Sequence, residues 1–77
     1  QEFLVIDLHI EVYTNQTLNQ LKSNLQKFNG LIPVIIRLIK DGKVTSVVVD
    51  EKYWVKNEEI VAETLGKIVG ENNFYFD

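Results

Sequence analysis

The chain has 77 residues, of which 45% are hydrophobic and 25% charged, and its formal net charge is -3. This length suits one domain near the lower size limit for a self-sufficient core, and the acidic balance argues against wrapping of nucleic-acid phosphates. The absence of cysteine excludes disulfides and thiolate metal sites, and no apolar run is long enough to cross a bilayer. Residue 1 is Gln rather than Met, so we expect residues 1–77 to be a single domain excised from a longer polypeptide.

The first predicted element is a half-buried strand over residues 3–12, FLVIDLHIEV, where apolar residues alternate with a period of two. One face of this strand carries Leu4, Ile6, Leu8, Ile10 and Val12. The other face carries Phe3, Val5, Asp7, His9 and Glu11.

A helix is predicted next, because leucines and a phenylalanine recur at helical spacing. The buried stripe would consist of Leu18, Leu21, Leu25 and Phe28. Thr17, with Gln20 three residues later, fits a capping box, and Asn15 is the competing N-cap. Gly30 is expected to end the helix by adopting a left-handed conformation.

Residues 33–50, PVIIRLIKDGKVTSVVVD, predict a β-hairpin around the dipeptide Asp41-Gly42. Both residues accept the positive φ angles of a two-residue turn at little cost. Counting outward from this turn gives the register, in which Ile39 faces Val44, Arg37 faces Ser46 and Ile35 faces Val48.

A second helix follows the hairpin, with Asn57 as N-cap and Glu58 and Glu59 in its first turn. Its buried stripe would be Ile60, Val61, Leu65, Ile68 and Val69. Gly70 would end this helix, and residues 74–76, FYF, would form a short last strand.

The element order is therefore β-α-β-β-α-β. We expect an α+β, two-layer ferredoxin-like sandwich, in which two helices cover one face of an antiparallel four-stranded sheet and the first and third strands are central. Besides the leucines of the first helix, the expected core consists of Leu4, Ile6, Leu8, Ile10, Val34, Ile36, Leu38, Val47 and Val49.

Such a sandwich leaves one sheet face without helices. A contiguous apolar patch on this face would indicate contact with a partner or a neighbouring domain, although long charged side chains could also cover it. The candidate binding residues are Val5, Ile35, Arg37, Ile39, Val44 and Val48.

The sequence offers little for catalysis. His9 is the single histidine, and any nucleophile-base pair would depend on it. Asp7 and Glu11 flank His9 and could pair with it or bind a metal weakly, but a solvated, charged strand face explains all three residues better. We therefore assign no catalytic and no metal-binding residue.

Four aromatic residues could stack on nucleic-acid bases, but the strand over residues 44–49 has no aromatic where RNA-recognition sheets place theirs. Packing in the core or at its rim is the better explanation of Tyr53, Trp54, Phe74 and Tyr75.

Over residues 17–70 the order and spacing of several residues form one pattern. It comprises a leucine helix, a glycine, a Pro-Val strand, a glycine hairpin, an isolated valine and a second leucine helix ending in glycine. The residues are Leu18, Leu21, Leu25, Gly30, Pro33, Val34, Gly42, Val55, Leu65 and Gly70. This pattern resembles the C-terminal domain of the bacterial DNA polymerase III alpha subunit. Tyr53-Trp54 and residues 74–76 have no counterpart in it.

The resemblance implies a non-catalytic, cytoplasmic tail domain that takes part in DNA replication. In that family a distant palm domain carries out polymerisation, and the C-terminal region tethers the polymerase to the clamp-loader tau subunit. The implied partners are tau or neighbouring domains of the parent polymerase, with little direct nucleic-acid binding, no membrane and no cofactor. No invariant contact residue defines this docking in the family, so the resemblance supplies no site residue.

A small-molecule regulatory domain of the ACT type is the alternative, since it shares the same element order. Such a domain would bind an amino acid near the loop over residues 13–17, which lacks the glycine or proline that these sites favour. A stand-alone enzyme is the least favoured interpretation.

Overall fold

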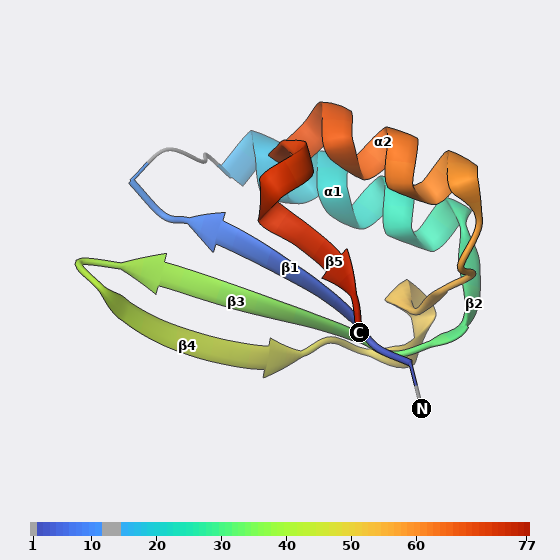
Figure 1. Cartoon of the computed structure of the whole chain (residues 1–77), viewed down its shortest axis with the longest axis horizontal. Coiled ribbons are helices and arrows are strands. Elements are labelled where there is room, and N and C mark those ends of the chain that lie inside the picture. Colours follow the sequence, from blue (N-terminus) through green and yellow to red (C-terminus); the bar gives the residue numbers. More distant parts are fainter. Residues whose placement is uncertain (1, 12–14) are drawn as a thin grey trace.

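The computed structural model describes residues 2–11 and 15–77. Helices α1 (Asn15–Lys27) and α2 (Glu59–Val69) lie side by side over one face of a four-stranded sheet (Figure 1). The strands of this sheet are β1 (Leu4–His9), β3 (Val34–Lys40), β4 (Lys43–Val48) and β5 (Phe74–Phe76), in the order β4-β3-β1-β5. The expected α+β class with both helices on one face is confirmed.

The sheet is mixed, which corrects the expected antiparallel arrangement. β1 is parallel to β3, with Ile6 opposite Ile36, and antiparallel to β5, with Ile6 opposite Phe74. The central strands are β1 and β3, so the expectation that the strand over residues 44–49 is central is wrong: it is β4, at an edge of the sheet. β1 and β3 are parallel because the crossover through α1 connects them. β3 is also the more buried strand of the hairpin, as a central position requires, whereas all residues of β4 are exposed.

The hairpin of β3 and β4 has the predicted register. Ile39 lies opposite Val44, Arg37 opposite Ser46 and Ile35 opposite Val48. Asp41 has φ 50° and Gly42 has φ 76°, so both central turn residues adopt the positive φ that the two-residue turn requires.

Two helix ends differ from the sequence predictions. α1 begins at Asn15, so Thr17 lies inside the helix and is not the N-cap that the capping box predicts. At α2 the N-cap is Glu58, which makes no side-chain cap hydrogen bond, and the Asn57 amide instead donates to the Glu2 carboxylate at 2.7 Å. Gly70 ends α2 as predicted, with φ 90° and its N–H donating to the Gly66 carbonyl.

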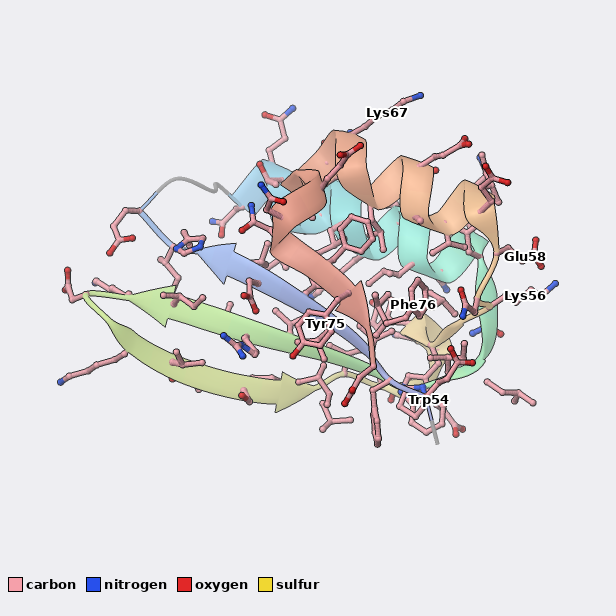
Figure 2. All side chains as sticks on the ribbon, in the orientation of Figure 1. Trp54, Lys56, Glu58, Lys67, Tyr75 and Phe76 are labelled. Carbon is pink, nitrogen blue, oxygen red and sulfur yellow. The ribbon has the colours of Figure 1, made fainter. Side chains whose placement is uncertain are left out.

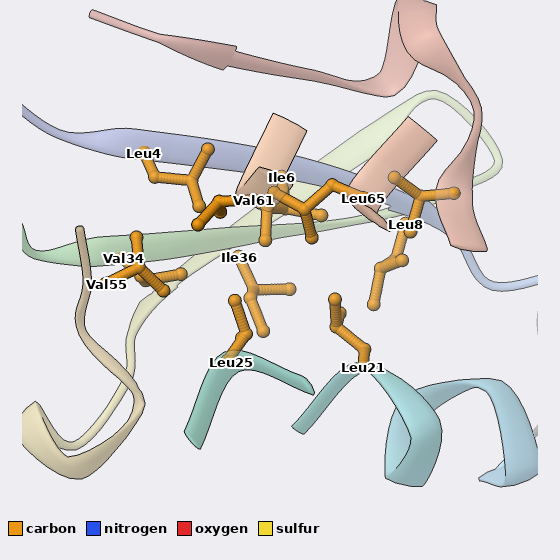
Figure 3. Packing of buried hydrophobic residues seen from close by; sticks show 11 residues of the cluster. Leu4, Ile6, Leu8, Leu21, Leu25, Val34, Ile36, Val55, Val61 and Leu65 are labelled. Atoms are coloured by element: carbon orange, nitrogen blue, oxygen red, sulfur yellow. The ribbon is translucent and has the colours of Figure 1, made fainter. Parts of the chain in front are cut away.

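One hydrophobic cluster fills the space between the sheet and the helices (Figure 3). Leu21 and Leu25 point from α1 towards Ile36 of β3 in the same view. The buried members of the cluster are Leu4, Ile6, Leu8, Leu21, Leu25, Val34, Ile36, Val55, Val61, Leu65 and Val69. Three residues expected to be buried are exposed instead. Ile10 follows the end of β1, Val47 lies on edge strand β4, beyond the cover of the helices, and Ile60 lies in the first turn of α2.

Gly30 has a different role from the one predicted. It lies in the short strand β2 (Asn29–Ile32) rather than at the helix end, and its N–H donates to the Trp54 carbonyl at 2.8 Å. A Cβ added at Gly30 would lie 2.6 Å from the carbonyl carbon and oxygen of Val55. Glycine is therefore required here for a close approach of two backbones.

The Asn29 side chain fixes the turn η1 (Glu51–Tyr53) beside β2. Its amide nitrogen lies within 3.3 Å of the carbonyl oxygens of Glu51, Lys52 and Trp54. These contacts hold the segment that places Val55 in the core. They depend on an asparagine 22 residues or more away in sequence, which local patterns do not reveal.

Candidate functional site

The candidate site is the sheet face opposite the helices, which we call the open face. Side chains alternate along each strand, so residues paired across strands share a face. The register therefore places the following described residues on the open face: Val5, Asp7, His9, Ile35, Arg37, Ile39, Val44, Ser46, Val48 and Tyr75. All six predicted binding residues are among them.

Exposure divides the six residues into three groups. Val44 and Val48 on the edge strand are 50% and 63% exposed, and Ile35, Arg37 and Ile39 on β3 are half-buried. Val5 is only 6% exposed, although it does not belong to the helix-side cluster. Its cross-strand neighbours Ile35 and Tyr75 flank it on the central strand. Val5 therefore supports the open face from within and offers little surface to a partner.

An ion pair divides the apolar surface of the open face. Arg37 Nε lies 2.9 Å from Asp7 Oδ1, and the two residues are directly opposed across the parallel strands β3 and β1. Both atoms are shielded from solvent and have no hydrogen-bond partner beyond this ion pair. The charges neutralise each other locally, which leaves the aliphatic residues around them as the main contact surface.

Asp7 and Glu11, the charged residues that flank His9 in sequence, each contact another group. Asp7 is engaged by Arg37, and Glu11 lies in the turn after β1, where its carboxylate accepts a hydrogen bond from the Asp41 N–H at 3.1 Å. This hydrogen bond lowers the pKa of Glu11, with smaller contributions from His9 and Lys40. Among residues 2–11 and 15–77, no three His, Asp or Glu side chains are grouped so that they could hold a metal ion.

The four aromatic residues separate into two roles. Tyr53, Trp54 and Phe74 pack against the helix-side core as predicted, and the Trp54 indole N–H donates to the Val49 carbonyl at 3.1 Å. Tyr75 instead lies on the open face opposite Val5 and is 48% exposed; Figure 2 shows it on the side of β5 away from the helices. Alternation within the segment Phe74-Tyr75-Phe76 could have revealed this outward position.

The loop considered for amino-acid binding, residues 13–17, begins with Tyr13 and Thr14, which lie outside the described residues. Within the described part of the chain, no helix is both long and apolar enough to span a membrane.

These features define an α+β two-layer protein with one helix-covered sheet face and one open face of aliphatic residues around a central ion pair. Comparison of the chain with protein-family models, with curated proteins and with solved structures finds no match.

Proposed function

We propose that this chain is a non-catalytic protein-interaction domain that docks through its open face. The observation that carries the proposal is the one-sided helix cover, which leaves Val44 and Val48 half-exposed or more, beside half-buried Ile35 and Ile39. Exposed apolar surface on one side of a sheet commonly marks protein contact sites. The Asp7–Arg37 ion pair would give such a contact a fixed polar centre.

We further propose that the domain is the C-terminal tail of a bacterial replicative DNA polymerase III alpha subunit, cytoplasmic in location. Its partner would be the clamp-loader tau subunit or a neighbouring domain of the polymerase. The support is the order and spacing of leucine, glycine and proline-valine positions over residues 17–70. The role is tethering, so polymerisation itself would reside elsewhere in the parent protein.

The test is a binding titration of this chain with a purified bacterial tau subunit. Val44→Asp and Ile39→Asp should each weaken binding at least about tenfold, because they place a charge in a contact that excludes water. Ile60→Asp is the matched control, since Ile60 on α2 is 49% exposed and lies on the helix layer. Circular dichroism should remain unchanged for all three variants.

Two results would contradict the proposal. If wild-type chain and tau do not associate, the assignment to this polymerase tail is wrong. If Ile60→Asp weakens binding as much as Val44→Asp does, the open face is not the contact surface.

A further inference from the structure

The free edge of β4 is the least protected part of the sheet. Within residues 2–11 and 15–77, β4 pairs with β3 alone and is one of the two edge strands, the other being the shorter strand β5 (Figure 1). All six of its residues are exposed. Edge strands usually carry a central lysine, a proline or a bulge that prevents pairing with another chain, whereas residues 44–49 are VTSVVV, without charge or proline.

The hydrogen-bond pattern shows which backbone groups of β4 face outward. The Val49 N–H donates to the Val34 carbonyl at 3.1 Å, and in an antiparallel ladder the residues that bond to one neighbour alternate with those that face away. Lys43, Thr45 and Val47 therefore bond towards β3. The N–H and C=O groups of Val44, Ser46 and Val48 point to the open edge.

We propose that a second copy of this chain occupies this edge, through antiparallel pairing of β4 with β4. A two-fold axis perpendicular to the sheet keeps the open faces of both copies on the same side of the joined sheet. Each residue of β4 therefore pairs with a residue whose side chain lies on the same face, so the two residue numbers are both even or both odd. The register centred on Ser46 uses all three outward residues. It pairs Ser46 with Ser46 and Val44 with Val48 of the second copy, and forms about six main-chain hydrogen bonds.

Charge favours a second copy as the occupant. β4 begins at Lys43, next to Lys40 across the hairpin; with Asp41 in the turn between them, this end has a net charge of +1, and β4 is followed by Asp50 and Glu51. Antiparallel self-pairing brings the lysine end of each copy to the acidic end of the other. The interface is thus complementary to itself.

The helix layer leaves room for this arrangement. α1 stops short of β4, and an apolar groove of about 190 Å³ remains between them, lined by Leu18, Lys22, Ile36, Leu38, Val47 and Val49. The pairing would join two sheets into one of eight strands, with both open faces on the same side. This inference does not depend on the proposed function, because self-pairing uses the edge of β4 and requires only a second copy of this chain.

The first experiment measures mass and amide exchange of the chain alone. Up to about 1 mM, sedimentation equilibrium should show twice the chain mass of 8.9 kDa. Exchange of the Val44, Ser46 and Val48 amides should slow as concentration rises, while the Val49 amide, already bonded to β3, should change little. A monomer throughout this range, or assembly beyond the dimer, would overturn the proposal.

The second experiment tests the register by disulfide cross-linking. The chain has no native cysteine, so any disulfide must involve the introduced residue. Ser46→Cys places two thiols on the axis with Cα atoms about 5.5 Å apart, within the range for a disulfide. Val48→Cys is the matched control, because its two copies lie four residues apart along the paired strands, roughly 14 Å. Ser46→Cys should oxidise to a covalent dimer much faster than Val48→Cys; equal rates would exclude this register.

A third variant separates pairing from folding. Ser46→Glu faces Arg37 across the hairpin, so the monomer tolerates the new carboxylate. In the dimer, two carboxylates would meet at the axis, and the dissociation constant of the dimer should increase at least about tenfold. An unchanged dimer would contradict the proposal, and circular dichroism verifies that the variant remains folded.

Discussion

Arg37 and Asp7 are directly opposed on the two central strands, with Arg37 Nε 2.9 Å from Asp7 Oδ1. The Asp7 side chain is 22% exposed and the Arg37 side chain 36%. The pair therefore lies between a surface salt bridge, which contributes little, and a buried one, in which loss of one partner is costly.

Removing one partner should cost more than removing both. Arg37→Met leaves the Asp7 carboxylate unpaired next to Val5 and should lower the free energy of unfolding by about 1–2 kcal/mol. Adding Asp7→Asn should restore part of this loss. Urea unfolding of both single variants and the double variant gives the coupling free energy, and a coupling near zero would show that the ion pair does not stabilise the fold.

Three glycines should respond differently to alanine. Gly30→Ala drives a Cβ into the Val55 backbone and should cost about 1–3 kcal/mol. Gly42→Ala meets no atom within 4 Å but retains φ 76°, at a cost of about 1 kcal/mol. Gly66→Ala should be neutral or stabilising by up to about 1 kcal/mol, because it improves helix propensity and approaches only the flexible Glu71 side chain, at 3.3 Å. Midpoints of urea unfolding establish the order, and a stable Gly30→Ala variant would refute the close approach.

Leu8 and Ile10 belong to the same alternating sequence pattern but should differ in importance. Leu8 is 3% exposed within the core, whereas Ile10 is 44% exposed in the turn after β1. Leu8→Ala should cost about 2–5 kcal/mol, and Ile10→Ala no more than about 0.5 kcal/mol. Thermal and urea unfolding of the two variants measure the difference, and comparable losses would mean that β1 continues past His9 in solution.

The hydrogen bond from the Asp41 N–H to Glu11 should be sensitive to acid. It lowers the pKa of Glu11 from the usual 4.5, so the folded state favours the ionised carboxylate. The contribution to stability is then complete above pH 4.5 and is lost as the pH falls through the lower pKa of the folded state.

An NMR titration provides the measurement for this hydrogen bond. As the pH is lowered, protonation of Glu11 weakens the hydrogen bond, and the Asp41 amide resonance should move upfield with a midpoint below pH 4.5. Glu11→Gln should abolish this titration. A midpoint at or above the usual value would show that Glu11 does not accept the bond in solution.

Local patterns predicted the elements that depend on neighbouring residues. Alternation placed Ile35, Ile39, Val44 and Val48 on one face, and Asp41-Gly42 set the hairpin register, because a two-residue turn leaves a single way to pair the flanking strands. The period of the leucines identified the buried stripe of α1. One helix layer on one side also followed from the element order.

The tertiary structure decided which distant segments became neighbours. The sequence alone does not determine that β3 rather than β4 pairs with β1. Both strands are rich in apolar residues, and the choice depends on how well each strand is buried on both faces. The role of Gly30 depends on the backbone of Val55, and the burial of Val5 depends on Ile35 and Tyr75. Local sequence determines conformation and register across a short turn, whereas contacts between remote segments arise only when the whole core is packed.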